Sequence, residues 1–163
     1  MKKLVVMSDT HVRPGVFRRV LNHEKQVDAL FFTGDGGRDL EFLETEFPRL
    51  AVYQVHGNCD FGSLFPAEGL ASFEGVLFFY THGHNYNVKY ELTELARAAA
   101  ARGADVALFG HTHLPTLEQI DTVTLFNPGS AGAPRFSAPT YGVITVEKGK
   151  PPRFEHKQVP PHE

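Results

Sequence analysis

The sequence lacks several features that define whole classes of protein. Its single cysteine, Cys59, leaves no intrachain disulfide, which excludes a disulfide-stabilised secreted scaffold. Its longest unbroken apolar run, residues 76–80, is far too short to span a bilayer. The formal net charge of -3 gives no basic field that would recruit nucleic acid or an anionic membrane surface. Tryptophan is absent, whereas there are nine histidines, and this histidine excess needs a chemical explanation.

The length of 163 residues fits one ordinary domain. We expect residues 1–163 to form that domain, with about 156–163 as a loose tail. The apolar stretch near the start, residues 4–7, is shorter than the roughly 7–15 residues of a signal-peptide core. We therefore expect a cytoplasmic protein.

Short apolar runs and helical patterns alternate in the first half of the chain. Leu40, Leu43 and Phe47, for example, recur at helical spacing. Strands that alternate with helices indicate parallel pairing. The expected elements are strands at 4–7, 29–32 and 52–55, and helices around 16–22 and 39–47.

Hairpins replace this pattern in the second half. They are expected at residues 70–80, 116–126 and 141–157, where paired apolar runs flank short turns. A helix over 91–102, capped by Gly103, and a further strand at 106–109 accompany them. The fold class is therefore α/β, with parallel strands early and antiparallel hairpins late.

A glycine-rich turn that carries Asp, Asn or His follows each of five expected strands. In α/β sheets, ligands bind outside the carboxyl ends of the strands, and glycine allows the backbone to turn sharply there. We therefore expect these side chains to share one site. They are Asp9 and His11, Asp35, Asn58, His82 and His84, and His111 and His113.

Carboxylate, amide and imidazole groups are the donors expected in this site. They suit Mn, Fe, Zn or Ni, and they argue against a cysteine-rich structural zinc site. The pair His111 and His113 has the spacing that points two imidazoles to one side of an extended segment. Taken alone, each motif also fits an ordinary capped turn, so the interpretation depends on their occurrence together.

Five motifs in a fixed order carry a family resemblance: Asp-x-His, Gly-Asp, Gly-Asn-x-Asp, His-Gly-His and Gly-His-x-His. From Asp9 to about Arg135 the chain resembles the calcineurin-like metallophosphoesterase superfamily, and within it the small YfcE/MJ0936-type phosphodiesterases. The resemblance implies a four-layer α/β/β/α sandwich of two mixed β-sheets flanked by helices. It also implies two divalent metal ions, with Mn expected and Fe, Zn or Ni compatible.

The resemblance further implies an activity, the hydrolysis of phosphodiester bonds by a hydroxide that bridges two metals. The implied metal ligands are, in order from the first metal to the second, Asp9, His11 and His113, the bridging Asp35, then Asn58, His82 and His111. The implied catalytic residues are Asp35, Asn58, His82 and Cys59. Cys59 is a departure, because many relatives have a histidine there that assists the leaving group.

Several assignments stay open at this point. His84 and Arg13 are candidate substrate contacts, with support of a ligand or a packing role as alternatives for His84. Phe61 and Phe65 either wall the cleft or are buried in a core or interface. Asp60 is expected to orient its turn or a neighbouring imidazole. The expected partner is a small-molecule phosphodiester substrate, with no membrane, and nucleic acid only as a substrate. Self-association as a dimer or tetramer is left open.

Other functions are compatible with the same residues. A phosphomonoesterase or a nuclease would use the same site with a different pocket. A non-catalytic protein-binding scaffold of the same fold is the third alternative. The complete set of expected metal ligands argues against the scaffold.

Overall fold

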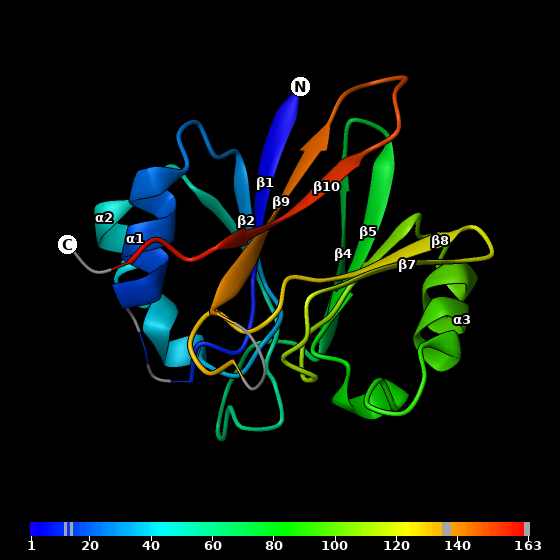
Figure 1. The fold of residues 1–163 in the computed structure, drawn as a ribbon, viewed down its shortest axis with the longest axis horizontal. Helices are drawn as coiled ribbons and strands as arrows, with labels where there is room; N and C mark the ends of the chain where they lie inside the picture. Colours follow the sequence, from blue (N-terminus) through cyan, green and yellow to red (C-terminus); the bar gives the residue numbers. More distant parts are fainter. Residues whose placement is uncertain (12, 14, 135–137, 162–163) are drawn as a thin grey trace.

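Two mixed β-sheets with helices on their outer faces make up the fold (Figure 1). The computed structural model describes residues 1–11, 13, 15–134 and 138–161. In these residues each sheet has five strands, and the layers follow one another as helix, sheet, sheet, helix. The four-layer arrangement implied by the sequence is confirmed.

The first sheet has the order β10-β9-β1-β2-β3. Its strands are β1 (Lys2–Met7), β2 (Ala29–Phe32), β3 (Ala51–Gln54), β9 (Thr140–Val146) and β10 (Arg153–Gln158). β1, β2 and β3 run parallel, whereas β9 and β10 add an antiparallel hairpin beside β1. The parallel pairing expected from the early alternation of strands and helices is confirmed.

The second sheet has the order β4-β5-β6-β8-β7. Its strands are β4 (Glu68–Phe73), β5 (Val76–Thr81), β6 (Val106–Leu108), β7 (Thr116–Ile120) and β8 (Val123–Asn127). The two outer pairs are the expected hairpins, and β5, β6 and β8 run parallel in the centre. Each sheet therefore places several strand carboxyl ends at one edge.

Two layers of helix cover the sheets from outside. The helical segments are α1 (Gly15–His23), η1 (Gly37–Leu40), α2 (Leu43–Glu46), η2 (His84–Tyr86) and α3 (Thr93–Ala101). The single helix expected at 39–47 is wrong, since the chain forms a 3-10 turn and then a short α-helix. Asp39 gives a physical reason: its buried carboxylate accepts hydrogen bonds from the Thr10 hydroxyl and the Arg13 amide, which fixes that turn against the loop after β1.

Alternating side chains of β1 show how the layers are held together. Leu4 and Val6 pack between the sheets, whereas Val5 and Met7 face the layer that contains Phe17 of α1. A third cluster joins α3 to the outer face of the second sheet. The sheets are therefore buried on both faces, and polar chemistry is confined to their edges and loops.

The end of the chain is more ordered than expected as far as Val159. Residues 156–158 belong to β10, and His156 pairs with Gly142. The Val159 side chain is buried, and its amide donates to the Pro139 carbonyl. The expected loose tail is therefore wrong for residues 156–159, because strand pairing and burial hold them, and residues 162–163 lie outside the described residues. Over the described chain, no helix has the length and apolarity needed to cross a membrane.

Candidate metal centre

The loops at one edge of the two sheets bring six of the seven predicted ligands together. Their donor atoms lie within 4.8 Å of one another inside each of three overlapping groups. One group is Asp9, His11 and His113; another is Asp35, His82 and His111; the third is His11, Asp35 and Cys59. The first two groups contain six of the seven ligands that the resemblance implies, and Asn58 is in neither.

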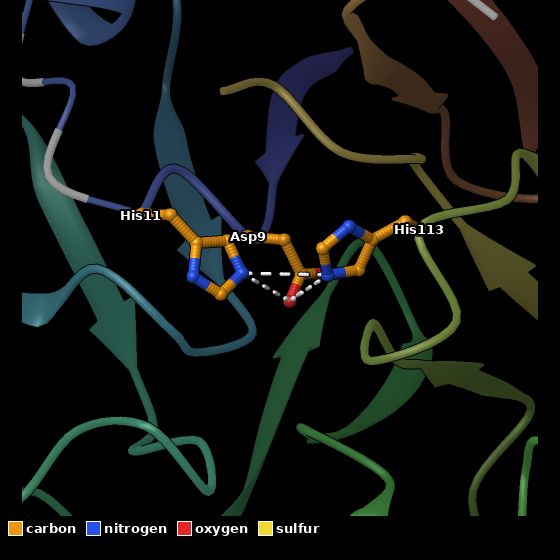
Figure 2. Close-up of side chains that lie close together, drawn as sticks. All are labelled: Asp9, His11 and His113. Atoms are coloured by element: carbon orange, nitrogen blue, oxygen red, sulfur yellow. Dashed lines mark hydrogen bonds and ion pairs between the residues drawn. The ribbon is translucent and has the colours of Figure 1, made fainter. Parts of the chain in front are cut away.

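The first group comes from the loops after β1 and β6 (Figure 2). The Nε2 atom of His11 lies 3.7 Å from Asp9 Oδ1, and the Nε2 atom of His113 lies 3.4 Å from the same oxygen. The two Nε2 atoms are 3.3 Å apart. Three donor atoms from two distant parts of the chain therefore surround one small space.

The second group lies beside the first. His82 Nε2 is 3.3 Å from Asp35 Oδ2 and 3.2 Å from His111 Nδ1. Asp35 Oδ2 is also 3.8 Å from His11 Nε2, so the two groups adjoin at Asp35. This position between the groups is the one expected of a bridging carboxylate.

Carbonyl groups fix the orientation of two imidazoles. His82 Nδ1 donates to the Thr33 carbonyl at 2.7 Å, and His113 Nδ1 donates to the Ala133 carbonyl at 2.8 Å. Because a carbonyl only accepts, the proton of each neutral ring is on Nδ1, and Nε2 presents a lone pair. These lone pairs face carboxylate oxygens, which is repulsive unless a cation or an added proton lies between them. Metal-binding histidines are oriented in the same way.

An unsatisfied oxygen provides the best test of whether a cation fits. Asp9 Oδ2 accepts hydrogen bonds from the Ser8 hydroxyl at 2.8 Å and from the His111 amide at 3.1 Å. Asp9 Oδ1 is buried and has no hydrogen-bond partner. A buried carboxylate oxygen without a partner is costly. Its closeness to two imidazole nitrogens fits a divalent cation.

The backbone of the site is strained. The φ angles of Asp9, His11, Asp35, His111 and His113 are 55°, 45°, 63°, 69° and 64°, all in the left-handed region. Such conformations cost about 1–3 kcal/mol each where glycine is absent, and they cluster at functional sites. Five predicted ligands therefore hold a conformation that the surrounding hydrogen bonds must stabilise.

Two glycines allow the strand ends to approach this closely. A Cβ atom on Gly57 would lie 2.1 Å from Asp35 Oδ1. A Cβ atom on Gly110 would lie 2.0 Å from the Ser8 hydroxyl oxygen. Both separations are too short for any side chain, so glycine is required at these positions for close approach.

Asp60 organises the loop that carries Asp35. Its carboxylate accepts hydrogen bonds from four backbone amides, those of Asp35, Gly36, Gly37 and Gly57, at 2.8–3.1 Å. The expected role of Asp60 in orienting its turn agrees with these contacts. Its link to the loop of Asp35 was not expected, because the two segments are distant in sequence.

The electrostatics of the cluster draw protons onto imidazoles. Burial raises the pKa of Asp9, but the imidazoles of His11 and His113 outweigh it and hold that pKa well below its usual range. Burial likewise raises the pKa of Asp35, and His82 outweighs it. The carboxylates in turn raise the pKa values of His11 and His82 against burial. A cation that binds here would replace those protons.

His111 differs from the other imidazoles. Its burial, the neighbouring His82 and the cation of Lys89 lower its pKa to about 4. A neutral imidazole is the form that binds a metal. His111 is therefore available as a ligand at neutral pH without losing a proton.

The remaining predicted site residues lie at the rim. Asn58 is exposed in its turn, and within the described residues its side chain makes no hydrogen bond or ion pair. His84 has a buried Nδ1 without a partner, and its ring centroid is 5.4 Å from that of His82. Burial, together with His82, lowers its pKa. Arg13 is exposed, and its amide donates to Asp39.

Cys59 contributes to the site through both its backbone and its side chain. Its amide donates to Asp35 Oδ1 at 2.8 Å, which leaves Oδ2 facing His82. Its thiol is exposed, in the group with His11 and Asp35. Burial and the charge of Asp35 raise the pKa of the thiol, so it remains protonated at neutral pH.

Ser130 supports the site from the turn that follows β8. The Ser130 hydroxyl donates to the Asp9 carbonyl and accepts from the Ala133 amide, both at 2.8 Å. Ala133 is also the residue whose carbonyl orients His113. Ser130 therefore connects this turn directly to the loop after β1 and, through Ala133, to the loop after β6. Because Asp9 is distant from Ser130 in sequence, the fold sets this contact.

Comparisons with known proteins identify the family of the chain. A family model for the calcineurin-like phosphoesterase superfamily domain matches residues 1–149. The probable metallophosphoesterase YsnB of Bacillus subtilis (strain 168) is 33% identical over 147 residues, which cover 88% of this chain and 84% of YsnB.

A second relative and two solved structures extend the comparison. Phosphodiesterase YfcE of Escherichia coli (strain K12) is 34% identical over 102 residues, 57% of this chain and 52% of YfcE. A structure of YfcE, a phosphoesterase from E. coli, matches with a TM-score of 0.67 and 28% identity over 88% of each chain. Vacuolar Protein Sorting 29 from Cryptosporidium parvum matches with a TM-score of 0.77 over 96% of this chain and 98% of its own, at 17% identity, which shows the fold alone. By its sequence and its fold, the chain belongs to the calcineurin-like phosphoesterase superfamily.

Proposed function

We propose that this chain is a dinuclear metal-dependent phosphodiesterase. The observation that carries the proposal is Asp9 Oδ1, a buried oxygen without a hydrogen-bond partner, which faces the ring nitrogens of His11 and His113. A second group of donors adjoins it at Asp35. Two adjoining sets of oxygen and imidazole donors suit divalent transition metals.

The residues divide into two sets of ligands. Asp9, His11 and His113 would hold one ion, and Asp35 would contact both. His82, His111 and the rim residue Asn58 would complete the second set. When bound, two such ions act as Lewis acids and lower the pKa of a bound water molecule toward neutral pH.

Charge favours an anionic substrate. Two divalent cations outweigh the carboxylates of Asp9 and Asp35, so the loaded site has a positive charge that a phosphodiester would neutralise. A neutral peptide would gain less from that charge. At the rim, the protonated Cys59 thiol would donate a weak hydrogen bond to the leaving oxygen, and His84 and Arg13 are the proposed substrate contacts.

Metal analysis combined with a substrate pair tests this function. Metal-free protein is titrated with Mn²⁺, and the loaded protein is assayed on bis(p-nitrophenyl) phosphate and on p-nitrophenyl phosphate. We expect two ions per chain and faster turnover of the diester. Faster turnover of the monoester would favour a phosphatase. Metal binding without turnover of either ester would favour a scaffold.

Asp35→Asn tests the bridging role. We expect it to abolish diester turnover and to lower the metal stoichiometry while the fold is kept. Asp121→Asn is a matched control, because Asp121 also has a left-handed φ, of 52°, but lies in the β7–β8 turn. Full activity of Asp35→Asn would refute the assignment.

Manganese as the working metal and a cytoplasmic location stay predictions. So do the single domain over residues 1–163 and self-association as a dimer or tetramer. Metal content of protein purified without added metal, and sedimentation at several protein concentrations, are the direct measurements of the first and the last.

A further inference from the structure

A deep cleft opens at the candidate metal centre. It has a volume of about 1180 Å³, and His11, Asp35 and Cys59 are among its lining residues. From there it runs past η1, α2 and β3 to the loop of residues 59–65. A phosphoryl group held at the metal site would therefore have one ester group directed at this cleft.

The lining of the cleft is rich in apolar side chains and aromatic rings. Its aromatic lining residues are Phe47, Tyr53, Phe61, Phe65 and Tyr80, and its aliphatic ones are Leu40, Leu43, Leu50, Val52 and Leu64. Phe61 is 87% exposed and Phe65 49% exposed, so of the alternatives left open by the sequence, burial in the core is wrong for both. Exposed apolar side chains gathered beside polar groups are typical of ligand sites.

The loop that carries Phe61 and Phe65 is tied to the metal site at one end and to His56 at the other. At one end Asp60 accepts hydrogen bonds from four amides, including that of Asp35. At the other end His56 bonds through Nδ1 to the Phe65 carbonyl at 2.8 Å and through its amide to the Pro66 carbonyl at 3.0 Å. The loop protrudes beyond the sheets in Figure 1, between β3 and β4. The start of the loop, next to Phe61, is therefore held by a carboxylate that also holds the backbone of Asp35.

The charges of the cleft exclude a polyanionic occupant. Among its lining residues, which are all described, Arg38 is the single lysine or arginine. Five of them are acidic: Asp35, Asp39, Glu41, Glu44 and Asp60. A bound nucleic acid strand needs cations along its backbone as well as rings on which bases stack. Here the rings occur without the cations.

We propose that this cleft binds an uncharged aromatic ester group of a small phosphodiester substrate. The inference rests on the proposed function, since the phosphoryl group is held at the metal site. It narrows the substrate class from any phosphodiester to one whose ester group is a flat apolar ring. The ring would lie against Phe61 and Phe65 while the phosphoryl oxygens face the metal ligands.

Binding of two phosphonates to the Mn²⁺-loaded protein tests the proposal. Phenylphosphonate and methylphosphonate share the phosphoryl group, resist hydrolysis and differ in the ring, and calorimetry gives each Kd. We expect phenylphosphonate to bind at least about 10-fold more tightly, because burial of a ring of this size is favourable. Affinities within about 2-fold of each other would overturn the proposal.

A matched pair of double variants locates the ring. Phe61→Ala/Phe65→Ala removes side chains that are 87% and 49% exposed, and Tyr90→Ala/Leu117→Ala removes side chains of the same exposures outside the cleft. We expect the affinity ratio to fall below about 2-fold in the first variant and to stay at its original value in the second. An equal loss in both, or in neither, would overturn the assignment to this cleft.

Other outcomes separate this inference from the proposed function. If neither phosphonate binds the loaded protein, the phosphoryl site itself is wrong and both proposals fail. If methylphosphonate binds and phenylphosphonate gains nothing, only the cleft proposal fails. In a third outcome, a short oligonucleotide displaces phenylphosphonate at a lower concentration than methylphosphonate does. This result would point to a nucleic acid occupant and would overturn the cleft proposal. The proposal would also be overturned if the protein showed no preference for phenylphosphonate and formed a dimer that the Phe61→Ala/Phe65→Ala variant did not form.

Discussion

The surroundings of buried Glu24 and those of buried Asp9 and Asp35 are built in opposite ways. The Glu24 cluster consists of Glu24, Lys3, Tyr141 and Lys157. Glu24 is 4% exposed; Lys3 lies 2.8 Å from its Oε1, and Lys157 lies 3.1 Å from its Oε2, which also accepts from the Tyr141 hydroxyl. In the metal-site cluster of Asp9, Asp35 and the neighbouring imidazoles, Asp9 Oδ1 has no hydrogen-bond partner.

This difference separates stability from binding. Both oxygens of Glu24 have partners, so the Glu24 cluster needs nothing further and holds the end of α1 to β1, β9 and β10. The metal-site cluster has strained backbone, an unsatisfied oxygen and lone pairs facing carboxylates, so it is complete only with added cations. Burial of a carboxylate is therefore no sign of function by itself, whereas an incomplete set of partners is.

Asp9→Asn gives the largest expected effect and is directed at the incomplete cluster. Because the amide removes a negative charge that faces two imidazoles, we expect diester turnover to fall at least about 100-fold, the upper effect of residues that only orient a ligand. The wild-type protein should gain about 2.7 kcal/mol of unfolding free energy at 100-fold excess of Mn²⁺ over its Kd, and the variant should lose that gain. Urea unfolding with and without Mn²⁺, beside the diester assay, measures both.

The comparison would break if Asp9→Asn destabilised the metal-free protein strongly and left the Mn²⁺ effect intact. We expect the metal-free protein to lose stability as well, because the imidazoles that hold the pKa of Asp9 down stabilise its ionised form in the fold. The asparagine oxygen can still accept from the Ser8 hydroxyl and the His111 amide, so the loss of the Mn²⁺ gain is the deciding measurement.

Glu24→Gln should have the reverse pattern. The amide no longer pairs with Lys3 and Lys157, and it leaves the buried Tyr141 hydroxyl a poorer acceptor, so we expect a loss of about 1–3 kcal/mol. Thermal unfolding should shift by about 2–4 °C for each kcal/mol lost. Turnover and the Mn²⁺ gain should stay at wild-type values. A fall in turnover comparable to that of Asp9→Asn, at a temperature where the variant is folded, would show that the Glu24 cluster serves the site.

Acid should erase the difference between Glu24→Gln and the wild type. Burial raises the pKa of Glu24, but Lys3, Tyr141 and Lys157 outweigh it and lower the pKa from 4.5 to about 2. A carboxyl whose folded-state pKa is depressed stabilises the protein fully above its unfolded-state pKa and loses that effect as pH falls through the folded-state pKa. The stability gap, measured by urea unfolding of metal-free proteins, should therefore be constant above pH 4.5 and shrink between 4.5 and 2. A gap that widens in that window would contradict the assignment.

The sequence predicted the site better than the structure around it, for a local reason. Each predicted ligand follows an apolar strand within a few residues, so Asp9, Asp35 and His82 could be placed at strand ends from the pattern alone. The ligand division itself came from the family resemblance. Neither source gave the five left-handed φ angles, because glycine neighbours predict a turn but not which residue takes the strained conformation.

Long-range contacts set the limit of sequence prediction. The helix expected at 39–47 splits because Asp39 binds the distant Thr10 and Arg13, and local spacing carries no information about them. The expected hairpin at 141–157 continues to Gln158 and is followed by buried Val159, an extension that the proline and charge content of the tail does not reveal. Asp60 and Ser130 likewise act on segments far away in sequence. The periodicity of the sequence predicted helices and strands, whereas the contacts between them could be seen only in the folded structure.

Cys59→His has the smallest expected effect, and it separates the backbone role of Cys59 from the role of its side chain. The Cys59 amide holds Asp35 Oδ1, and this backbone contact survives any substitution that keeps the turn, whereas the exposed side chain is free to change. A raised pKa keeps the thiol protonated, but a thiol is a weak donor, and histidine is a better proton donor near neutral pH. We expect turnover to rise about 5- to 10-fold for aryl phosphodiesters with the poorest leaving groups, and to rise little for those with the best. This increase is a small part of the rate enhancement that a well-positioned general acid contributes. Rates across a series of aryl esters, with Cys59→Ser as the control, measure this, and an unchanged ranking of leaving groups would show that position 59 acts through its backbone alone.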